Sequence, residues 1–459
     1  MSNLVFVYIW KPTLIWKRIT ENSMLRRRFL SSATIGSLAL GGTPILAAKA
    51  GRKYRTALIG SGWWGMNVLQ EAMAAGKAKV VGLCDVDEES IDVSAEKVER
   101  LSGDSPKGYK DYRELLAKEK PEVVIIATPD HWHALPFIAA CEAGAHVFVE
   151  KPTSHTIAES HAMVKATQAS GITAQVGLHR RIGPHHVSAM KFLKSGAVGD
   201  IGMVRTFVAG RGGREAPSLN QDPSDGLDWN MYCGPAPLRP FNTKIHPGGW
   251  RNFLDFANGT LGDWGVHWLD QVLWWTEEKA PKYVHSTGGR PVRGKAILNK
   301  ESQTTDAPDT QVATFEFESF TATWEHRKYA KNASEKHSIG AYFYGTEGVF
   351  HMGWRDGWTF YPSDPKKKTF HENHQLQEPD GHNLKLLWAD FIDAIEKKRP
   401  PVCDIESSHR SSVLPMLGML SYKLGRGVAW DGDKEIIPGD TKAQKLLRRE
   451  YREPWKYPV

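Results

Sequence analysis

The 459-residue chain has little cysteine and no long apolar run, and each absence excludes a class of protein. The four cysteines lie far apart, with no C-x-x-C pair, at Cys84, Cys141, Cys233 and Cys403. This spacing excludes a zinc ribbon and a small disulfide-stapled domain, so we expect four packed thiols. The apolar stretch at residues 33–46 is too short and too rich in Gly, Ser and Thr for a spanning helix. We therefore expect no stable membrane anchor.

The net positive charge is also small once the N-terminus is set aside. The net charge is +7, but residues 1–50 hold seven basic residues and one acidic residue, which leaves 52 basic and 51 acidic residues in the remainder. A remainder that is close to neutral lacks the basic surface that binds nucleic acid, so we expect no nucleic-acid partner. The basic excess belongs to the N-terminal segment.

Residues 1–50 have the pattern of an export signal. An arginine run at residues 26–28 precedes a modestly apolar stretch, and small residues at 48–50 (AKA) have the spacing that a signal peptidase needs. The arginine pair resembles a twin-arginine signal, which predicts export to the periplasm by that route. Met24 lies just before the arginines and competes with Met1 as the true start.

Residues 54–65 are predicted to form a strand, a glycine-rich turn and the start of a helix. The turn reads G-S-G-W-W-G, in which Gly60 makes the tight turn and Gly62 lets a pyrophosphate approach the backbone. Gly65 lets the helix pack closely on the strand. The N-terminus of that helix offers free N–H groups and a positive dipole end to phosphates, so this segment is predicted to bind a dinucleotide.

The next strand, at residues 79–84, ends in Asp85, which lies 20 residues after Gly65. A carboxylate there accepts hydrogen bonds from the ribose hydroxyls and repels a 2′-phosphate. Asp87 adds negative charge, and no arginine follows at once, so NAD is predicted rather than NADP. Strands and helices alternate as far as residues 174–176, which predicts a parallel, doubly wound Rossmann domain over residues 51–180.

Two motifs follow later strands of this sheet, at the carboxyl ends where open α/β sheets bind ligands. Thr128 and Pro129 follow the strand predicted at residues 123–127, and Glu150-Lys151-Pro152 follows the strand at 146–149. The proline cannot extend the strand, so Lys151 should point into the cofactor crevice. An ammonium group there can polarise a substrate oxygen or hold a neighbouring acid–base group in the right state.

Beyond about residue 183, short alternating strands replace the β/α alternation. Their pattern predicts an α+β domain at residues 181–430 built on an antiparallel sheet, followed by a C-terminal tail at residues 431–459. Helices near residues 383–397 and 408–424 are expected to pack back on the first domain. The expected strands cover residues 201–209, 283–287, 311–317, 321–327, 338–345 and 348–352.

Asp263 and His267 lie four residues apart, so on a helix they share one face. An imidazole can take a hydroxyl proton while hydride leaves the same carbon, and a neighbouring carboxylate can orient the substrate. Asp270, three residues after His267, leaves two other interpretations open: a metal site or a core histidine that Asp270 satisfies. No third ligand has a persuasive spacing, and we expect no metal.

Residues 211–258 are irregular and rich in Gly, Pro, Asn, Asp and Trp, and a segment of this length without regular structure is usually functional. Its aromatic faces and arginine forks can meet the apolar faces and hydroxyls of a sugar. The predicted substrate-binding residues are His179, Arg180, Trp229, Tyr232, Trp250, Arg251, Asp263 and His267.

Taken in order, these motifs resemble the glucose–fructose oxidoreductase, inositol dehydrogenase and rhizopine-catabolism family (Gfo/Idh/MocA) over residues 52–430. The resemblance implies a Rossmann domain, a second domain with a large, mostly antiparallel open sheet, and a homo-oligomer, dimer or tetramer. It also implies catalytic roles for Lys151, Asp263 and His267, whereas His179 stands where the family often has Asn. The implied cofactor-binding residues are Gly60, Gly62, Trp63, Trp64, Gly65, Asp85, Thr128, Pro129, His133, Glu150 and Lys151.

The predicted function is hydride transfer between NAD, with NADP less favoured, and a CH–OH group of a small-molecule carbohydrate: a sugar, cyclitol or glycoside. No free NAD pool is expected outside the cytoplasm, so an exported enzyme should hold its cofactor tightly and regenerate it in the site. Glycoside cleavage through transient oxidation is therefore an alternative. A non-catalytic sugar-binding protein is a second alternative.

Overall fold

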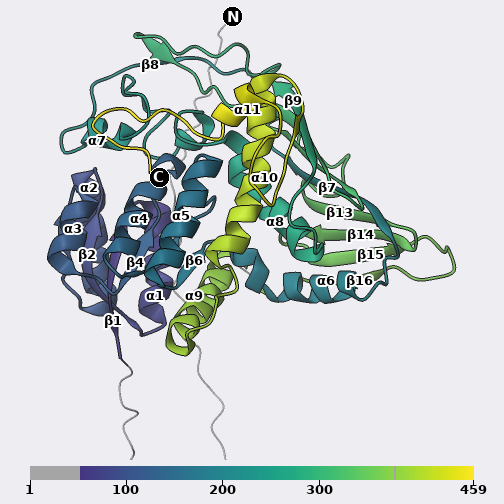
Figure 1. Ribbon diagram of the computed structural model, residues 1–459, viewed down its shortest axis with the longest axis horizontal. Coiled ribbons are helices and arrows are strands. Elements are labelled where there is room, and N and C mark those ends of the chain that lie inside the picture. Colours follow the sequence, from purple (N-terminus) through teal and green to yellow (C-terminus); the bar gives the residue numbers. More distant parts are fainter. Residues whose placement is uncertain (1–51, 377–378, 459) are drawn as a thin grey trace, which may run out of the picture. The chain divides into compact units, whose positions relative to one another are not determined.

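Six parallel strands form the first sheet of the protein, on the left of the view in Figure 1. The computed structural model describes residues 52–376 and 379–458, so the predicted signal at residues 1–50 lies outside the described residues. The strand order is β3-β2-β1-β4-β5-β6. The chain adds β1 to β3 toward one edge of the sheet and β4 to β6 toward the other, so a crevice opens at the carboxyl ends of β1 and β4. The strands are β1 (Tyr54–Ile59), β2 (Ala78–Cys84), β3 (Lys107–Tyr109), β4 (Val123–Ile126), β5 (His146–Val149) and β6 (Ala174–Val176).

The central strands β4 (VVII) and β5 (HVFV) are apolar along their length because helices cover both faces of the sheet. The helices that follow the strands confirm the predicted Rossmann fold. They are α1 (Trp63–Ala74), α2 (Glu88–Ser102), α3 (Tyr112–Glu119), α4 (Ala134–Glu142) and α5 (Ile157–Ser170). All four cysteines are buried, free thiols, as predicted.

Nine strands form the second sheet, in the order β16-β15-β14-β13-β7-β12-β11-β9-β17. All neighbouring pairs are antiparallel except β12 and β7, which confirms the mostly antiparallel sheet. The strands are β7 (Ile201–Ala209), β9 (Tyr283–Gly289), β11 (Thr310–Glu316), β12 (Thr321–Arg327), β13 (Ile339–Gly345), β14 (Gly348–Gly353), β15 (Trp358–Pro362), β16 (Phe370–Glu372) and β17 (Val428–Ala429).

One face of the second sheet is covered by helices α6 (Pro184–Lys194), α8 (Val266–Trp275) and α10 (Ile405–Leu424). Residues alternate between buried and exposed along β11 and β12, as expected for a sheet with one covered face. Helix α10 contacts both α5 of the first domain and β9 of the second sheet, and it lies between the two sheets in Figure 1.

Helix α9 (Pro379–Lys397) packs on the first sheet, as the sequence predicted. Its Trp388 is buried 5.9 Å from the Phe148 ring of β5, measured between ring centroids. The segment predicted as a tail at residues 431–459 is instead packed where it is described, and it carries α11 (Thr441–Lys445). Arg449 pairs with buried Glu159 at 2.8 Å, and the Trp455 ring meets Trp132 edge-on. None of the described helices has both the length and the apolar character needed to cross a membrane.

The region predicted to be irregular, residues 211–258, has only short elements but a core of its own. Apolar side chains from within the segment fill this core. Their packing fixes the loop, which has little regular main-chain hydrogen bonding. Its elements are β8 (Ser218–Leu219), which pairs with β10 (Ser302–Gln303), α7 (Trp229–Cys233) and the 3₁₀ turn η3 (Trp250–Asn252).

Candidate active site

A cleft at the carboxyl ends of β1, β2 and β4 has the shape that a dinucleotide needs. Gly60 ends β1 with a φ of +89°, and a Cβ there would lie 2.7 Å from the Ala127 carbonyl. A Cβ on Gly65 would lie 2.0 Å from the Gly60 oxygen, whereas a Cβ on Gly62 would meet nothing within 4 Å. Two glycines therefore permit close packing, and Gly62 leaves open space at the N-terminus of α1.

Asp85 lines this cleft and directly follows β2. Its carboxylate accepts hydrogen bonds from the Ser61 N–H at 2.8 Å and from the Asp87 N–H at 3.2 Å. Burial raises the pKa of Asp85 to about 6 in spite of these bonds, so the group is mostly ionised at neutral pH. A carboxylate held there fits the ribose hydroxyls of NAD and opposes a 2′-phosphate.

The aromatic residues Trp63 and Trp64 line the cleft, together with Thr128 and Pro129. His133, from the same motif, lies behind the wall. Its ring nitrogens are 2.8 Å from the Pro152 carbonyl oxygen and 2.9 Å from the Thr128 carbonyl oxygen. Burial lowers the pKa of His133 to about 4, so the neutral ring donates to one of these carbonyls. His133 thus fixes two motifs against each other and does not line the cleft.

Glu150 is buried beside Lys151 and lines a second, larger cavity that adjoins the cleft. Burial raises the pKa of Glu150, and hydrogen bonds from the Trp64 side chain and the Lys151 N–H oppose the rise. A Cβ on Gly177 would lie 2.5 Å from the Glu150 carboxylate, so a glycine at 177 makes room for it. Glu150 therefore supports Trp64 in the cofactor cleft.

Lys151 and Asp263, which lie 112 residues apart in the sequence, meet in this cavity as an ion pair that the sequence did not predict. The Lys151 Nζ donates to the Asp263 Oδ1 at 2.7 Å and to the Asp263 main-chain oxygen at 2.9 Å. Burial alone would raise the pKa of Asp263, but the charges of Lys151 and Arg251 outweigh it and lower the pKa to about 2. The Arg251 Nε lies 3.2 Å from the same Oδ1, so Asp263 stays ionised between two cations.

The local backbone explains how Asp263 can hold Lys151 with two oxygens. The sequence predicted a plain helix through Asp263 and His267, but residues Leu261–Gly265 form a π-helical turn, η4, which leads directly into α8. A π-turn alters the usual main-chain hydrogen bonding, and such turns are frequent at functional sites. Asp263 and His267 nevertheless line one cavity.

His267 is buried at the inner end of the cavity, and its exposed fraction is 7%. Burial, reinforced by the charges of Arg180 and Lys151, holds its pKa well below the usual value. The imidazole is therefore neutral at physiological pH and able to accept a proton. Its ring lies 5.3 Å from the His179 ring, between centroids.

Asp270 does not satisfy His267, which removes both alternatives left open by the H-x-x-D spacing. The Asp270 carboxylate accepts hydrogen bonds from Arg181 at 2.9 Å and from the Ser411 hydroxyl at 2.7 Å. The His267 Nδ1 has no hydrogen-bond partner among the described residues. His267 is therefore neither a core histidine tied to Asp270 nor half of a metal site with it.

The predicted substrate residues divide into two groups. His179, Arg180, Trp250 and Arg251 line the cavity with Asp263 and His267. Arg180 stacks over the Trp268 ring at 4.4 Å.

Trp229 and Tyr232 belong elsewhere. Trp229 stacks on Tyr232, with ring centroids 4.8 Å apart, and donates to the Arg239 carbonyl oxygen at 2.7 Å, so it packs the loop core. Tyr232 lines the cofactor cleft. Neither aromatic residue lines the larger cavity that holds Lys151, Asp263 and His267, which we call the reaction cavity.

Ten residues that line the cavity were not predicted from the sequence, and four of them, Asp130, Trp264, Trp354 and Arg355, carry an ionisable group or an aromatic ring that could bear on the substrate. Asp130 carried a usable signal, because it follows Thr128-Pro129 at the end of β4. Burial raises its pKa to about 8, and Lys151 and Arg251 oppose the rise. Trp354 and Arg355 come from the turn after β14, and no sequence spacing relates that turn to the Rossmann motifs.

Two family models match the chain and together cover most of it. One is described as oxidoreductase family, NAD-binding Rossmann fold, and matches residues 54–178. The other is described as oxidoreductase family, C-terminal alpha/beta domain, and matches residues 211–457. The first match contains the first sheet, and the second contains the loop core and most of the second sheet.

Similar proteins include a glycosyl hydrolase family 109 protein of Parabacteroides distasonis, 23% identical over 440 residues, 88% of this chain and 90% of that protein. A glycosyl hydrolase family 109 protein of Akkermansia muciniphila is 30% identical over 154 residues, 32% of each chain. A levoglucosan dehydrogenase of Pseudarthrobacter phenanthrenivorans is 33% identical over 185 residues, 40% of each chain. The last two matches span less than half of those relatives.

Solved structures with the same fold include a levoglucosan dehydrogenase in complex with NADH and levoglucosan. It has a TM-score of 0.63 and 21% identity, over 82% of this chain and 99% of that chain. An aldose–aldose oxidoreductase from Caulobacter crescentus, in complex with glycerol, has a TM-score of 0.60 and 18% identity, over 82% of this chain and 100% of that chain. At these identities, the likeness shows the fold.

Because the carboxyl of Asp130 is buried and its pKa is raised, we predict that the stability of the folded protein depends on pH. The pKa of Asp130 is about 8 in the folded protein, against 3.8 as the ordinary value, so the unfolded chain releases this proton first as pH rises. The free energy of unfolding therefore falls between about pH 4 and pH 8. Asp130→Asn cannot ionise, so its melting temperature should rise relative to the wild type across this interval.

Thermal unfolding followed by circular dichroism from pH 5 to pH 8 measures this difference. The matched control is Asp92→Asn, because Asp92 is exposed on α2 and away from the cavity. A difference between Asp130→Asn and wild type that stays constant over this pH range would show that Asp130 has no raised pKa.

Proposed function

This chain belongs to the Gfo/Idh/MocA family of NAD-binding oxidoreductases, and we propose that it oxidises or reduces a CH–OH group of a sugar, cyclitol or glycoside. The observation that carries this proposal is the pairing of Lys151 with Asp263 in a cavity that also holds a neutral, buried His267. The cavity adjoins the dinucleotide cleft, since both share Trp63, Trp64, Thr128, Trp250 and Arg251 in their walls.

Each residue of this group has a distinct task in the proposed mechanism. The residues that line the cleft, among them Gly62, Asp85 and Thr128, would hold NAD, which would supply the hydride acceptor or donor for the substrate carbon. His267, neutral because burial lowers its pKa, takes the proton of the same hydroxyl in the oxidation and gives it back in the reduction. Lys151 polarises the substrate oxygen as charge develops on it. Asp263 holds the Lys151 ammonium in place with two of its oxygens.

The walls of the cavity support a carbohydrate as the substrate. Trp250, Trp264 and Trp354 present aromatic surface, while Arg180 and Arg355 add guanidinium groups. This mixture suits a molecule with apolar ring faces and many hydroxyls. The relative named as levoglucosan dehydrogenase supports the same substrate class.

Glycoside cleavage is the second candidate function. The glycosyl hydrolase family 109 relative from Parabacteroides distasonis matches 88% of this chain, more than the dehydrogenase relative does. In such a reaction, oxidation of a carbinol makes the neighbouring C–H acidic. A general base takes that proton, the C–H electron pair forms a C=C bond, and the aglycone leaves with the C–O electron pair. Water then adds across the C=C bond, and the cofactor would return the hydride that it took at the start, so no net oxidation occurs.

Localisation and assembly extend the proposal. We propose export to the periplasm by the twin-arginine route, which the arginine run and the small residues at 48–50 support. We also propose a homo-oligomer, because none of the helices described by the structure covers one face of the second sheet. Met203, Tyr283 and Val312 share that face and are 41%, 42% and 43% exposed, respectively.

Substitution of the two reacting side chains tests the mechanism. His267→Ala should lower kcat by about 100- to 10,000-fold because the proton acceptor is lost. Lys151→Ala should lower kcat by about 100- to 1,000-fold because charge on the substrate oxygen is no longer stabilised. The control Lys194→Ala removes an exposed lysine at the end of α6 and should retain full activity.

Turnover is measured by NADH absorbance with a panel of sugars, cyclitols and glycosides, and quenching of tryptophan fluorescence by NAD shows that each variant still binds cofactor. Activity near the wild-type level in both His267→Ala and Lys151→Ala would refute the mechanism.

Aryl glycosides distinguish the two candidate functions. An oxidoreductase accumulates NADH with the sugar and releases no aglycone. A glycoside-cleaving enzyme releases aglycone without net NADH and, in deuterated water, places deuterium on the carbon beside the transiently oxidised one. Aglycone release that continues after the nucleotide is removed would contradict both functions, because neither proceeds without the cofactor.

The exported protein should begin near residue 51 and should have the molar mass of a dimer or tetramer. N-terminal sequencing of the periplasmic fraction and light scattering of the purified protein measure the two properties. A mature protein that begins near Ile59, inside β1, would contradict the proposed signal. A monomer at micromolar concentration would contradict the proposed assembly.

A further inference from the structure

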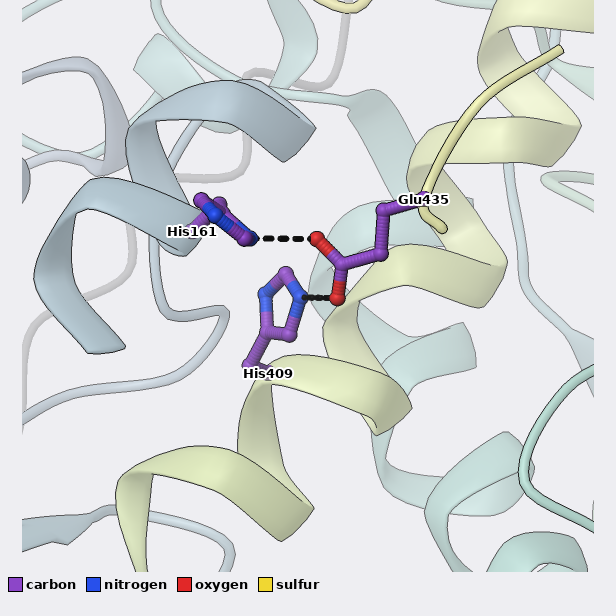
Figure 2. Close-up of side chains that lie close together, drawn as sticks. All are labelled: His161, His409 and Glu435. Carbon is purple, nitrogen blue, oxygen red and sulfur yellow. Dashed lines mark hydrogen bonds and ion pairs between the residues drawn. The ribbon is translucent and has the colours of Figure 1, made fainter. Parts of the chain in front are cut away.

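Two histidines and a glutamate converge outside the walls of the cofactor cleft and the reaction cavity (Figure 2). His161 lies on α5, His409 lies on α10, and Glu435 lies in the turn between β17 and α11. The His161 Nδ1 is 2.6 Å from one Glu435 carboxylate oxygen, and the His409 Nε2 is 2.7 Å from the other. None of the three lines the cofactor cleft or the reaction cavity.

The ligand atoms of these side chains lie within 4.8 Å of one another, close enough to share a single ion. Two imidazole nitrogens and a carboxylate oxygen form a ligand set that suits zinc and related divalent transition metals. Three protein ligands leave a fourth tetrahedral position for water or another small ligand.

The surroundings of His409 have a feature that metal sites share, a hydrogen-bond partner for the second ring nitrogen of the histidine. His409 is buried, with an exposed fraction of 2%, and its Nδ1 is 2.7 Å from the Ser160 hydroxyl. Ser160 is in turn 2.5 Å from the Thr153 hydroxyl, so its position is fixed from behind. A metal-binding histidine usually engages an outer partner through its second nitrogen, which sets the ring orientation. Ser160 occupies that position here.

The charges beside the cluster bear on the fourth ligand. The adjoining hollow is lined by Lys165, Lys434, Lys445 and Arg448 together with His161 and Glu435. These cations disfavour a bare dication, but a metal bound to the Glu435 carboxylate also attracts an anion. A small anion or hydroxide in the fourth position would face the cationic side of the hollow.

We propose that His161, His409 and Glu435 bind one divalent transition-metal ion of the zinc class. The ion would join three elements that are far apart in the sequence: α5 of the Rossmann domain, α10 between the two sheets, and the C-terminal segment. Because the unfolded chain does not hold these ligands together, metal binding stabilises the folded state. The site does not depend on the proposed function, since no ligand belongs to the active site.

Zinc binding to the full chain tests the proposal. The protein is treated with EDTA, dialysed against Zn²⁺ at stated free concentrations, and assayed for bound zinc by elemental analysis. We expect a saturable site that holds one zinc per chain, with a melting temperature that rises as zinc is added. Co²⁺ in the same site should give the visible absorbance of a four-coordinate ion with nitrogen and oxygen ligands.

The variants separate a metal site from a hydrogen-bonded cluster. His161→Ala and Glu435→Gln should weaken zinc binding by more than about 100-fold and abolish the zinc-dependent rise in melting temperature, because each removes a ligand. Ser160→Ala leaves all three ligands and should weaken zinc binding by about 10- to 100-fold, because only the outer partner of His409 is lost. The control His285→Ala removes an exposed histidine of β9 and should bind zinc as the wild type does.

Two results would overturn the proposal. Wild-type protein that retains no zinc at micromolar free Zn²⁺ would show that the three side chains form only a hydrogen-bonded cluster. Equal zinc affinity and stoichiometry in wild type, His161→Ala and Glu435→Gln would place the bound zinc elsewhere, for example at His337, His351 and Asp356, which also lie close together.

Discussion

The active site depends on one ion pair, between Lys151, which follows β5, and Asp263 in the π-helical turn η4 before α8. The two side chains are only 12% and 23% exposed, so each charge would be costly without the other. Arg251 completes the arrangement from the loop core. Opposite charges therefore hold these three parts of the chain together, and the reaction cavity lies between them.

The polar groups behind this pair keep the site rigid without joining the reaction. His133 links the Thr128 turn to the Pro152 turn, and Arg181 with Ser411 holds Asp270 away from His267. The pKa of His267 is therefore set mainly by burial and by nearby cations, and not by Asp270. The cavity therefore holds a neutral imidazole that can accept a proton and an ionised carboxylate that has no proton to donate.

Much of the site could be predicted because the relevant signals are local. A glycine that must permit close approach, such as Gly60 or Gly65, lies next to the strand it serves, and Asp85 has a fixed spacing from them. Other contacts have no local signal. Trp354 and Arg355 reach the cavity from a turn of the second sheet, and Trp229 looked like a sugar-binding residue but packs the loop core. The segment at residues 431–459 looked like a tail because its anchors, Arg449 and Trp455, pair with residues roughly 300 positions earlier.

The sequence by itself determined the Rossmann fold, the antiparallel sheet and the preference for NAD. Each of these follows from residue type and short spacing, which act through steric fit and main-chain hydrogen bonding over a few residues. Tertiary structure alone decided which ionisable groups lie near one another, and hence their charges. Asp130 and Asp263 have the same carboxyl group, yet the pKa is raised to about 8 in one and lowered to about 2 in the other. That difference comes from burial and from the distance to Lys151 and Arg251, which only the folded chain establishes.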